Sequence, residues 1–486
     1  MKRYIIFWLG LTAVFGCDDF LEENPETFQT PQTFFQNEQQ LDQAVTAIYD
    51  RNRSLINEEH WRFGENRSDN TSFLYNPNDR GGIVNEEVDL FLMVSANGNI
   101  GGYWNKSYDG ISRANFALQN LDGVEFSDEA VRETRRGEIL FLRSWFYFNL
   151  AQLFGDVPFV TSAGGTPDEI LTDEFLERTP VAQVYDSILV DVQTAIDLLP
   201  PPAEAETGRA TRGAALMLKA KMYMVLQQFD QAIPLLEEMQ GLGYALQDTY
   251  ASVFAPDNKN NSESVFEIQY SFDLGQGSDF VTRFVPWNSG NDILGSNGPA
   301  VSRGGQNQPT QSLINVYDTT DARFLHNISF YDDGTTAEPW MSKYNYGFAD
   351  PTLQVQNINL PMFRYADVLL MLAECYHETG SGDPVALLEQ VRARSLADPA
   401  LVPDEAVDLD VAIANERRRE LAFENHRWFD LLRTGKAVEV MTAHGEQQKA
   451  QKPTVPAAAY TNIRTLLGIP LGQVQQFDVE QTPGWE

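Results

Sequence analysis

Several aromatic residues of this 486-residue chain stand in polar, glycine-containing stretches rather than in apolar runs. Trp61 and Tyr75 lie in "HWRFGENRSDNTSFLYNPNDRGG", and Trp287 is followed by Asn288 in "FVPWNSGND". A flat ring can stack on the apolar C–H face of a sugar, while Asn, Asp and Arg side chains bind its hydroxyl groups. These residues predict a carbohydrate-binding surface. The alternative is that each aromatic residue folds back into the core, as Phe73, Trp340, Tyr344 and Tyr346 could also do.

Motifs for enzymatic chemistry are missing from the sequence. It contains no GxSxG elbow, no P-loop and no HExxH motif. A glycosidase needs only two suitably placed carboxylates, and 69 acidic residues leave that possibility open. The five histidines show no metal-ligand spacing and are predicted to be surface or capping residues: His60, His326, His377, His426 and His444. We predict no catalytic residue, no metal ion and no cofactor.

The segment "NERRRELAFENHRWFDLLRTG" is rich in arginine and could suggest an anion-binding site. Acidic residues alternate with its arginines at helical spacing, however. Ion pairs within and between helices explain this pattern more simply than a bound anion does. We therefore interpret the segment as structural.

The charge balance limits the possible partners. The chain has 35 basic and 69 acidic residues, which gives a formal charge of −34. A polyanion such as nucleic acid would be repelled by this charge. The sequence therefore predicts no nucleic-acid partner.

The N-terminus reads as an export signal. After Lys2 and Arg3 come thirteen uncharged residues, too few to span a bilayer but enough for a signal-peptide core. Gly16 precedes Cys17 in a context that resembles the lipobox of bacterial lipoproteins, so we predict cleavage before Cys17 and its lipidation. An ordinary signal peptide with an incidental cysteine is the alternative. The other cysteine, Cys375, lies in an apolar helical pattern and is predicted to be an inert buried thiol.

The rest of the chain is predicted to be mainly α-helical. A long helix is expected over 132–154, apolar nearly all round and ended by Gly155. Small and aromatic residues recur at tetratricopeptide-like offsets in two helix pairs, Ala220, Tyr223, Ala232 and Leu236 in one and Ala373, Tyr376 and Ala386 in the other. Between about 248 and 360 the sequence becomes rich in Gly, Asn, Ser and Pro, which predicts loops.

Taken in order, the segments resemble the SusD/RagB family of Bacteroidetes outer-membrane glycan-binding lipoproteins. The resemblance extends over nearly the whole chain. It is carried by "RGEILFLRSWFYFNLAQLFGDVPFV", "GRATRGAALMLKAKMYMVL", "LPMFRYADVLLMLAECYHETG", "NERRRELAFENHRWFDLLRTG" and the ending "IPLGQVQQFDVEQTPGW".

The resemblance implies a fold, a location and partners. The fold would be a scaffold of tetratricopeptide-type helix pairs packed against a loop-rich, ligand-binding half. The protein would be lipid-anchored to the outer membrane, face the cell exterior and pass an oligosaccharide or polysaccharide to a SusC-like TonB-dependent transporter. Asp69 and Arg80 lie in the loop that borders the sugar site in this family. The candidate glycan-binding residues are Trp61, Asp69, Tyr75, Arg80, Trp287 and Asn288.

We expect five regions along the chain. They are a signal peptide (1–16), a lipidated tether (17–30), an N-terminal helical region (31–247) with ligand-bordering loops (57–110), a loop-rich ligand-binding insertion (248–360), and a C-terminal helical region (361–486). The acidic residues directly after Cys17 indicate either a surface-export signal or a solvated tether. Two other functions stay open: a surface protein whose helical array binds a peptide or protein, and a hydrolase without a recognisable motif.

Overall fold

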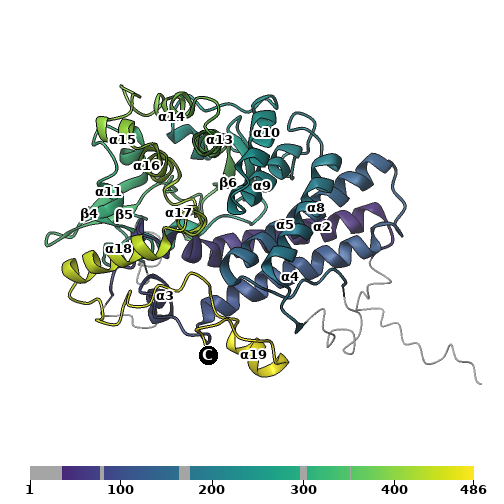
Figure 1. Ribbon diagram of the computed structural model, residues 1–486, viewed down its shortest axis with the longest axis horizontal. Coiled ribbons are helices and arrows are strands. Elements are labelled where there is room, and N and C mark those ends of the chain that lie inside the picture. Colours follow the sequence, from purple (N-terminus) through teal and green to yellow (C-terminus); the bar gives the residue numbers. More distant parts are fainter. Residues whose placement is uncertain (1–34, 77–81, 164–175, 296–303, 351) are drawn as a thin grey trace, which may run out of the picture.

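The computed structural model of the chain describes residues 35–76, 82–163, 176–295, 304–350 and 352–486. Sixteen α-helices and six short β-strands lie within these ranges (Figure 1). The prediction of a mainly α-helical protein is therefore confirmed.

Four long helices lie side by side at the right of Figure 1, each packed against the next in chain order. They are α2 (Glu38–Leu55), α4 (Gly98–Leu121), α5 (Glu129–Phe154) and α8 (Val181–Leu198). The helix predicted over 132–154 is α5. Its N-cap is Asp128, which accepts a hydrogen bond from Ala130 N, and it ends at Gly155, whose φ of +74° favours glycine. Residues on every side of α5 are buried, as its sequence predicts.

Two tetratricopeptide-like helix pairs continue this array. The first is α9 (Arg212–Val225) with α10 (Phe229–Gln240), and the second is α13 (Tyr365–Thr379) with α14 (Pro384–Arg392); α10 packs on α13 and joins the pairs. Ala220, Ala232 and Ala373 are fully buried. Small side chains at these positions let neighbouring helices approach closely.

The other half of the molecule is made of loops, short helices and three two-stranded antiparallel sheets. The sheets pair β1 (Thr71–Ser72) with β3 (Gln308–Pro309), β2 (Ser264–Ile268) with β6 (Leu360–Arg364), and β4 (Ile328–Asp332) with β5 (Ala337–Met341). The remaining helices are α3 (Ile83–Asp89), α11 (Gln311–Ile314), α12 (Ala322–Asn327), α15 (Pro403–Val407), α16 (Leu409–Leu421), α17 (Arg427–Arg433), α18 (Ala437–Gln451) and α19 (Leu471–Phe477).

A main hydrophobic core runs through the helical array and under the sheets. A smaller cluster of Val281, Val285, Leu294 and Trp340 lies within the loop-rich half. The β2–β6 sheet joins the predicted insertion to the region after it, because β6 spans the expected boundary at residue 360. The division into regions stays a prediction.

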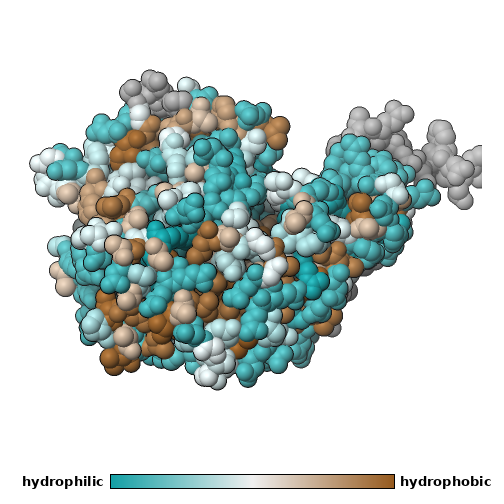
Figure 2. Space-filling model, turned by 90° about the horizontal axis from the view of Figure 1, so that it is seen from above, coloured by the Kyte–Doolittle hydropathy of each residue, from teal (hydrophilic) through white to brown (hydrophobic). Residues whose placement is uncertain are grey.

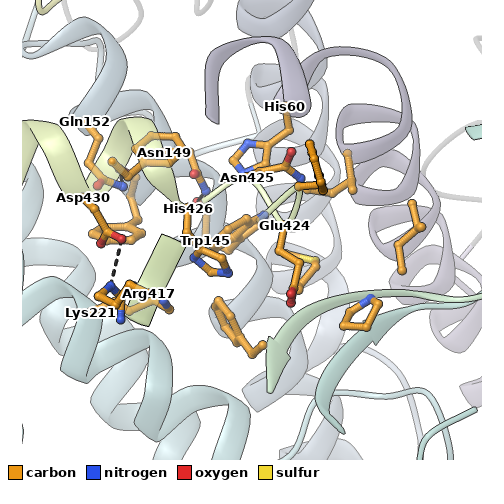
Figure 3. Close-up of a pocket in the computed structure, with 18 of the residues that line it drawn as sticks. His60, Trp145, Asn149, Gln152, Lys221, Arg417, Glu424, Asn425, His426 and Asp430 are labelled. Atoms are coloured by element: carbon orange, nitrogen blue, oxygen red, sulfur yellow. Dashed lines mark hydrogen bonds and ion pairs between the residues drawn. The ribbon is translucent and has the colours of Figure 1, made fainter. Parts of the chain in front are cut away.

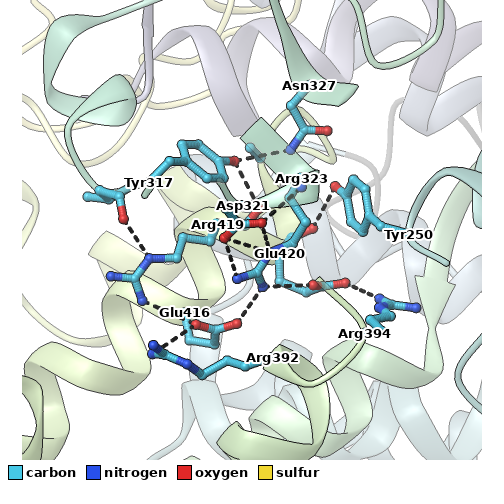
Figure 4. A network of polar contacts seen from close by, with 12 residues as sticks. Tyr250, Tyr317, Asp321, Arg323, Asn327, Arg392, Arg394, Glu416, Arg419 and Glu420 are labelled. Carbon is cyan, nitrogen blue, oxygen red and sulfur yellow. Dashed lines mark hydrogen bonds and ion pairs between the residues drawn. The ribbon is translucent and has the colours of Figure 1, made fainter. Parts of the chain in front are cut away.

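A large ionic cluster is buried where α12, α14, α16 and β6 meet (Figure 4). Arg323 is fully buried and binds Asp321, Glu416 and Glu420, and Arg364 binds Glu420, Glu424 and Glu263. The cluster contains six cations and six carboxylates: Arg323, Lys343, Arg364, Arg392, Arg394 and Arg419 with Glu263, Asp321, Glu405, Glu416, Glu420 and Glu424. Its formal charge is zero.

A small ionic cluster lies beside α13 and α17 and is balanced in the same way. Its ion pairs link Lys221, Arg417 and Arg433 with Asp367, Glu374 and Asp430. The arginines of the predicted structural segment thus bind acidic side chains, as expected from their alternation. Since both clusters are neutral, the chain's charge of −34 lies entirely on other residues. On the face seen in Figure 2, hydrophobic side chains form separate patches on a mostly hydrophilic surface.

Candidate functional site

Three segments that are distant in sequence are joined by backbone hydrogen bonds in the loop-rich half. β1 pairs with β3, and beyond this pairing Leu74 N donates to Gly305 O at 2.8 Å. Gly305 N in turn donates to Val285 O at 2.6 Å, and Gln306 N to Arg283 O at 3.1 Å. These hydrogen bonds hold the three segments against one another.

Buried polar residues from the C-terminal part of the chain and from α3 hold β1 in place. Lys452 Nζ donates to Ser72 Oγ at 2.6 Å. The carboxylate of Asp89 accepts from Phe73 N at 2.9 Å and from Tyr460 Oη at 2.8 Å. Burial raises the pKa of Asp89 to about 6, against the effect of these hydrogen bonds. The C-terminal part of the chain thus fixes the position of β1.

The β4–β5 hairpin holds the third segment in place. Asn288 Nδ2 donates to Asp333 Oδ2 at 2.8 Å, and Tyr331 Oη donates to Asp292 Oδ2 at 2.6 Å. Trp340 of β5 is buried in the small hydrophobic cluster beneath them. The side chains on the loop 287–292 are therefore held from two directions.

The structure brings together three of the predicted site residues, Tyr75, Trp287 and Asn288. Trp287 Nε1 donates to the backbone oxygen of Tyr75 at 3.2 Å. The Tyr75 side chain is 37% exposed and Trp287 is partly exposed. We call the surface formed by Tyr75, Trp287, Asn288, Asp292, Tyr331 and Asp333 the loop platform.

Hydrogen bonds shift the pKa of two side chains of the platform, Asp333 and Tyr331. The backbone N–H groups of Thr336 and Thr335, and then the amide of Asn288, lower the pKa of Asp333 below its ordinary value. The hydrogen bond to Asp292 raises the pKa of Tyr331, which stays a neutral donor. At neutral pH the platform combines aromatic rings, an amide and charged carboxylates. These groups can stack on a sugar ring and accept hydrogen bonds from its hydroxyls.

Two predicted site residues belong to the interior instead, and their assignment is corrected. Trp61 is 0% exposed, packed edge-on against Phe284 at 5.2 Å between ring centroids. Its stretch is not a loop but a continuation of α2 through two π-helical turns, Ile56–His60 and Arg62–Asn66. A ring buried on every side cannot stack on a sugar.

Asp69 is the other corrected residue, because it is 4% exposed. It binds Arg427 at 2.7 Å and Arg418 at 3.2 Å. Burial alone would raise the pKa of Asp69, but these two guanidinium groups hold it below its usual range. Arg80 and Cys17 lie outside the described residues.

Other sequence predictions can also be compared with the structure. Trp340 and Tyr344 are buried, so the alternative of aromatic residues folding into the core is right for them. The prediction of surface or capping histidines is wrong for His60 and His444, which are 5% and 2% exposed. Burial also raises the pKa of the Cys375 thiol to about 12, so this cysteine is inert as predicted.

Comparisons with known proteins decide the family. A family model described as "Starch-binding associating with outer membrane" (SusD-like) matches residues 19–224, and the SusD family model (SusD/RagB) matches residues 327–485. The chain belongs to the SusD family.

Relatives of this SusD-family protein match it along nearly its whole length. "SusD-like protein P25" of Formosa agariphila is 26% identical, over 91% of this chain and 91% of its own. A solved "Laminarin binding SusD-like protein" has 27% identity and a TM-score of 0.73, covering 93% of this chain and all of its own. "Surface glycan-binding protein A from Bacteroides thetaiotaomicron in complex with laminarihexaose" shares the fold, with 21% identity, a TM-score of 0.70 and coverage of 92% and 99%.

A cavity lies between the helical array and the C-terminal region of this SusD-family protein (Figure 3). His60, Trp145, Lys221, Arg417 and Asp430 are among its lining residues. Arg417 Nε donates to Asp430 at 2.8 Å, and burial lowers the pKa of His60 to about 3, so the ring is neutral. The cavity offers water about 70 Å³, against roughly 300–1,000 Å³ for sites that bind drug-sized ligands. This cavity is therefore too small for a sugar chain, whereas the loop platform is open to solvent.

The sequence did not reveal this cavity, because its lining comes from segments as distant as the π-helical turn Ile56–His60, α9 and α17. Among the described residues, no group of three or more His, Cys, Asp or Glu side chains is placed to hold a metal ion. The described helices also include none that is long and apolar enough to cross a membrane.

Proposed function

We propose that this SusD-family protein captures a glycan at the loop platform and breaks no bond in it. The observation that carries this proposal is the pairing of Tyr75 with Trp287. The partly exposed Trp287 ring donates a hydrogen bond to the backbone oxygen of Tyr75, whose own ring is also partly exposed, on a surface otherwise built from polar loops. A ring held in this way loses little conformational entropy when a sugar stacks on it.

Exposed acceptors beside the rings support the same proposal. Asp292 accepts a hydrogen bond from Tyr331, and Asp333 accepts one from Asn288, while both carboxylates stay exposed to solvent. Sugar hydroxyl groups can donate to exposed carboxylates of this kind.

Among possible glycans, laminarin is the first to test. The solved relative at 27% identity is described as laminarin-binding, and it covers nearly the whole of both chains. Laminarin is an uncharged glucan, and its glucose rings offer apolar faces to Tyr75 and Trp287.

The proposal includes an anchor and a partner. Cys17, as the lipidated first residue of the mature chain, would hold the protein at the outer membrane with the platform facing the cell exterior. A SusC-like TonB-dependent transporter would receive the oligosaccharide for import. The description of the matching family model, which names the outer membrane, supports this location.

Replacing Cys17 with Ala should release the protein from membranes in fractionated cells, since a stable anchor needs the acyl chains. Unchanged membrane retention would contradict the lipid anchor at Cys17.

Isothermal titration calorimetry tests glycan capture. The lipid-free mature protein is titrated with laminarin and with a panel of oligosaccharides, and each mixture is then examined by chromatography. We expect binding to at least one glycan and no cleavage product. A product would identify a hydrolase instead. Failure of every glycan, with intact co-purification of a transporter barrel, would favour a protein- or peptide-binding function.

A further inference from the structure

The hydrogen-bonding groups of the loop platform are mostly acceptors. Asp292 and Asp333 are exposed, and their carboxylates offer lone pairs to a ligand. The hairpin adds Glu338, which lies opposite Tyr331 in the β4–β5 pairing and accepts from Gln308 Nε2 at 2.9 Å. A ligand that complements these groups must bring donors.

Basic groups at the platform are already engaged. Arg283 is the cation nearest to the loop 287–292 in the described sequence, and its guanidinium binds Asp279 at 3.2 Å. Lys452 is buried beneath the surface on Ser72. Elsewhere, nine cations are neutralised inside the two ionic clusters. The described part of the platform therefore lacks a free cation; Arg80 and Arg303 lie outside the described residues.

Resting on the proposed glycan capture, we infer that the platform selects uncharged glycans and discriminates against glycans that carry uronic acid or sulfate groups. A neutral sugar supplies hydroxyl donors to the acceptors. An ionised carboxylate or sulfate group supplies no donor and faces the field of Asp292, Asp333 and Glu338. Sugar stacking on Trp287 is common to both classes, so the discrimination comes from charge.

Matched pairs of oligosaccharides test this inference. Calorimetry would compare neutral oligosaccharides, laminarihexaose among them, with uronic-acid oligosaccharides of the same length, at low and at high ionic strength. We expect the acidic ligands to bind about tenfold or more weakly at low salt, and the gap to narrow as salt screens the carboxylates. Affinity for the neutral ligand should change little with salt.

A charge-neutralising variant locates the effect. Asp292→Asn keeps an oxygen that can accept from Tyr331, so it changes charge with little change in shape. It should reduce the difference in affinity between acidic and neutral ligands about threefold at low salt. Asp186→Asn is the matched control, because Asp186 is exposed on α8, on the opposite side of Figure 1 from the β4–β5 hairpin. It should leave the gap unchanged.

The outcomes separate this inference from the proposed function. Acidic ligands that bind as tightly as neutral ones, with an affinity that falls as salt rises, would overturn the inference and leave glycan capture standing. If Asp186→Asn reduced the affinity difference as much as Asp292→Asn does, the inference would also be overturned. The selectivity would then come from the net charge of the whole protein. If neither class of glycan binds, the proposed function fails and this inference fails with it.

Discussion

The large ionic cluster and the loop platform are both rich in polar residues, but they use them in opposite ways. In the cluster, Glu420 is fully buried and binds three arginines. On the platform, Asp333 is exposed and binds only neutral N–H donors, and the rings of Tyr75 and Trp287 reach the solvent. A side chain whose partners are all internal stabilises the fold, whereas one left partly exposed can meet a ligand. Residue type alone does not distinguish the two.

The largest expected effect comes from unbalancing the ionic cluster. Arg323→Leu removes a fully buried cation and leaves Asp321, Glu416 and Glu420 with an uncompensated negative charge. The free energy of unfolding should fall by about 3–5 kcal/mol. Chemical denaturation measures this loss.

The control for Arg323 is an arginine whose ion pair is solvated. Arg132 binds Glu129 at 2.7 Å, and these side chains are 23% and 66% exposed. Arg132→Leu should cost less than about 1 kcal/mol. Equal losses in the two variants would show that burial does not separate the cluster from the surface.

The second prediction concerns the buried tryptophan. Trp61→Ala leaves a cavity next to Phe284, so unfolding should require about 3–5 kcal/mol less free energy. Thermal and chemical denaturation of this variant would be compared with those of Trp287→Ala. If Trp61→Ala had native stability but lost glycan binding, the correction that moves Trp61 into the core would be wrong.

Acidification should lower the free energy of unfolding through a residue of the interior, His60. His60 is buried, and burial lowers its pKa from 6.5 to about 3, so the unfolded chain binds a proton below pH 6.5 that the folded chain does not. The stability of the wild type should therefore fall relative to His60→Gln as the pH drops from 7 to 4, by roughly 3 kcal/mol. Denaturation curves at several pH values measure the difference between the two proteins. A difference that does not change with pH would show that His60 titrates alike in both states.

Local sequence patterns predicted much of the fold. The end of α5 at Phe154 follows from its apolar stripe and from Gly155, and the buried alanines of the helix pairs follow from their spacing. The ionic clusters could be expected from alternating charges only in part, because Arg323 and Glu416 are 93 residues apart in sequence. Pairing over that distance depends on the tertiary fold.

The candidate site was predictable only in part for the same reason. Trp61 and Trp287 have similar polar neighbours, yet one is buried and the other reaches the solvent. A signal was available for Trp61, since the apolar spacing of α2 reaches Leu55 and Ile56 and continues to Phe63. For Trp287 the position depends on the contact with Tyr75, 212 residues away.

The most direct test of the account is glycan titration of Trp287→Ala beside Phe330→Ala. Phe330 is 53% exposed on β4, and side chains alternate along a strand, so its ring faces away from the side of Tyr331. We predict that Trp287→Ala weakens binding by about 1–3 kcal/mol, that Phe330→Ala leaves affinity unchanged, and that both variants melt near the wild-type temperature. Native affinity in Trp287→Ala, or a loss of stability as large as that of Trp61→Ala, would contradict the assignment of glycan capture to the loop platform.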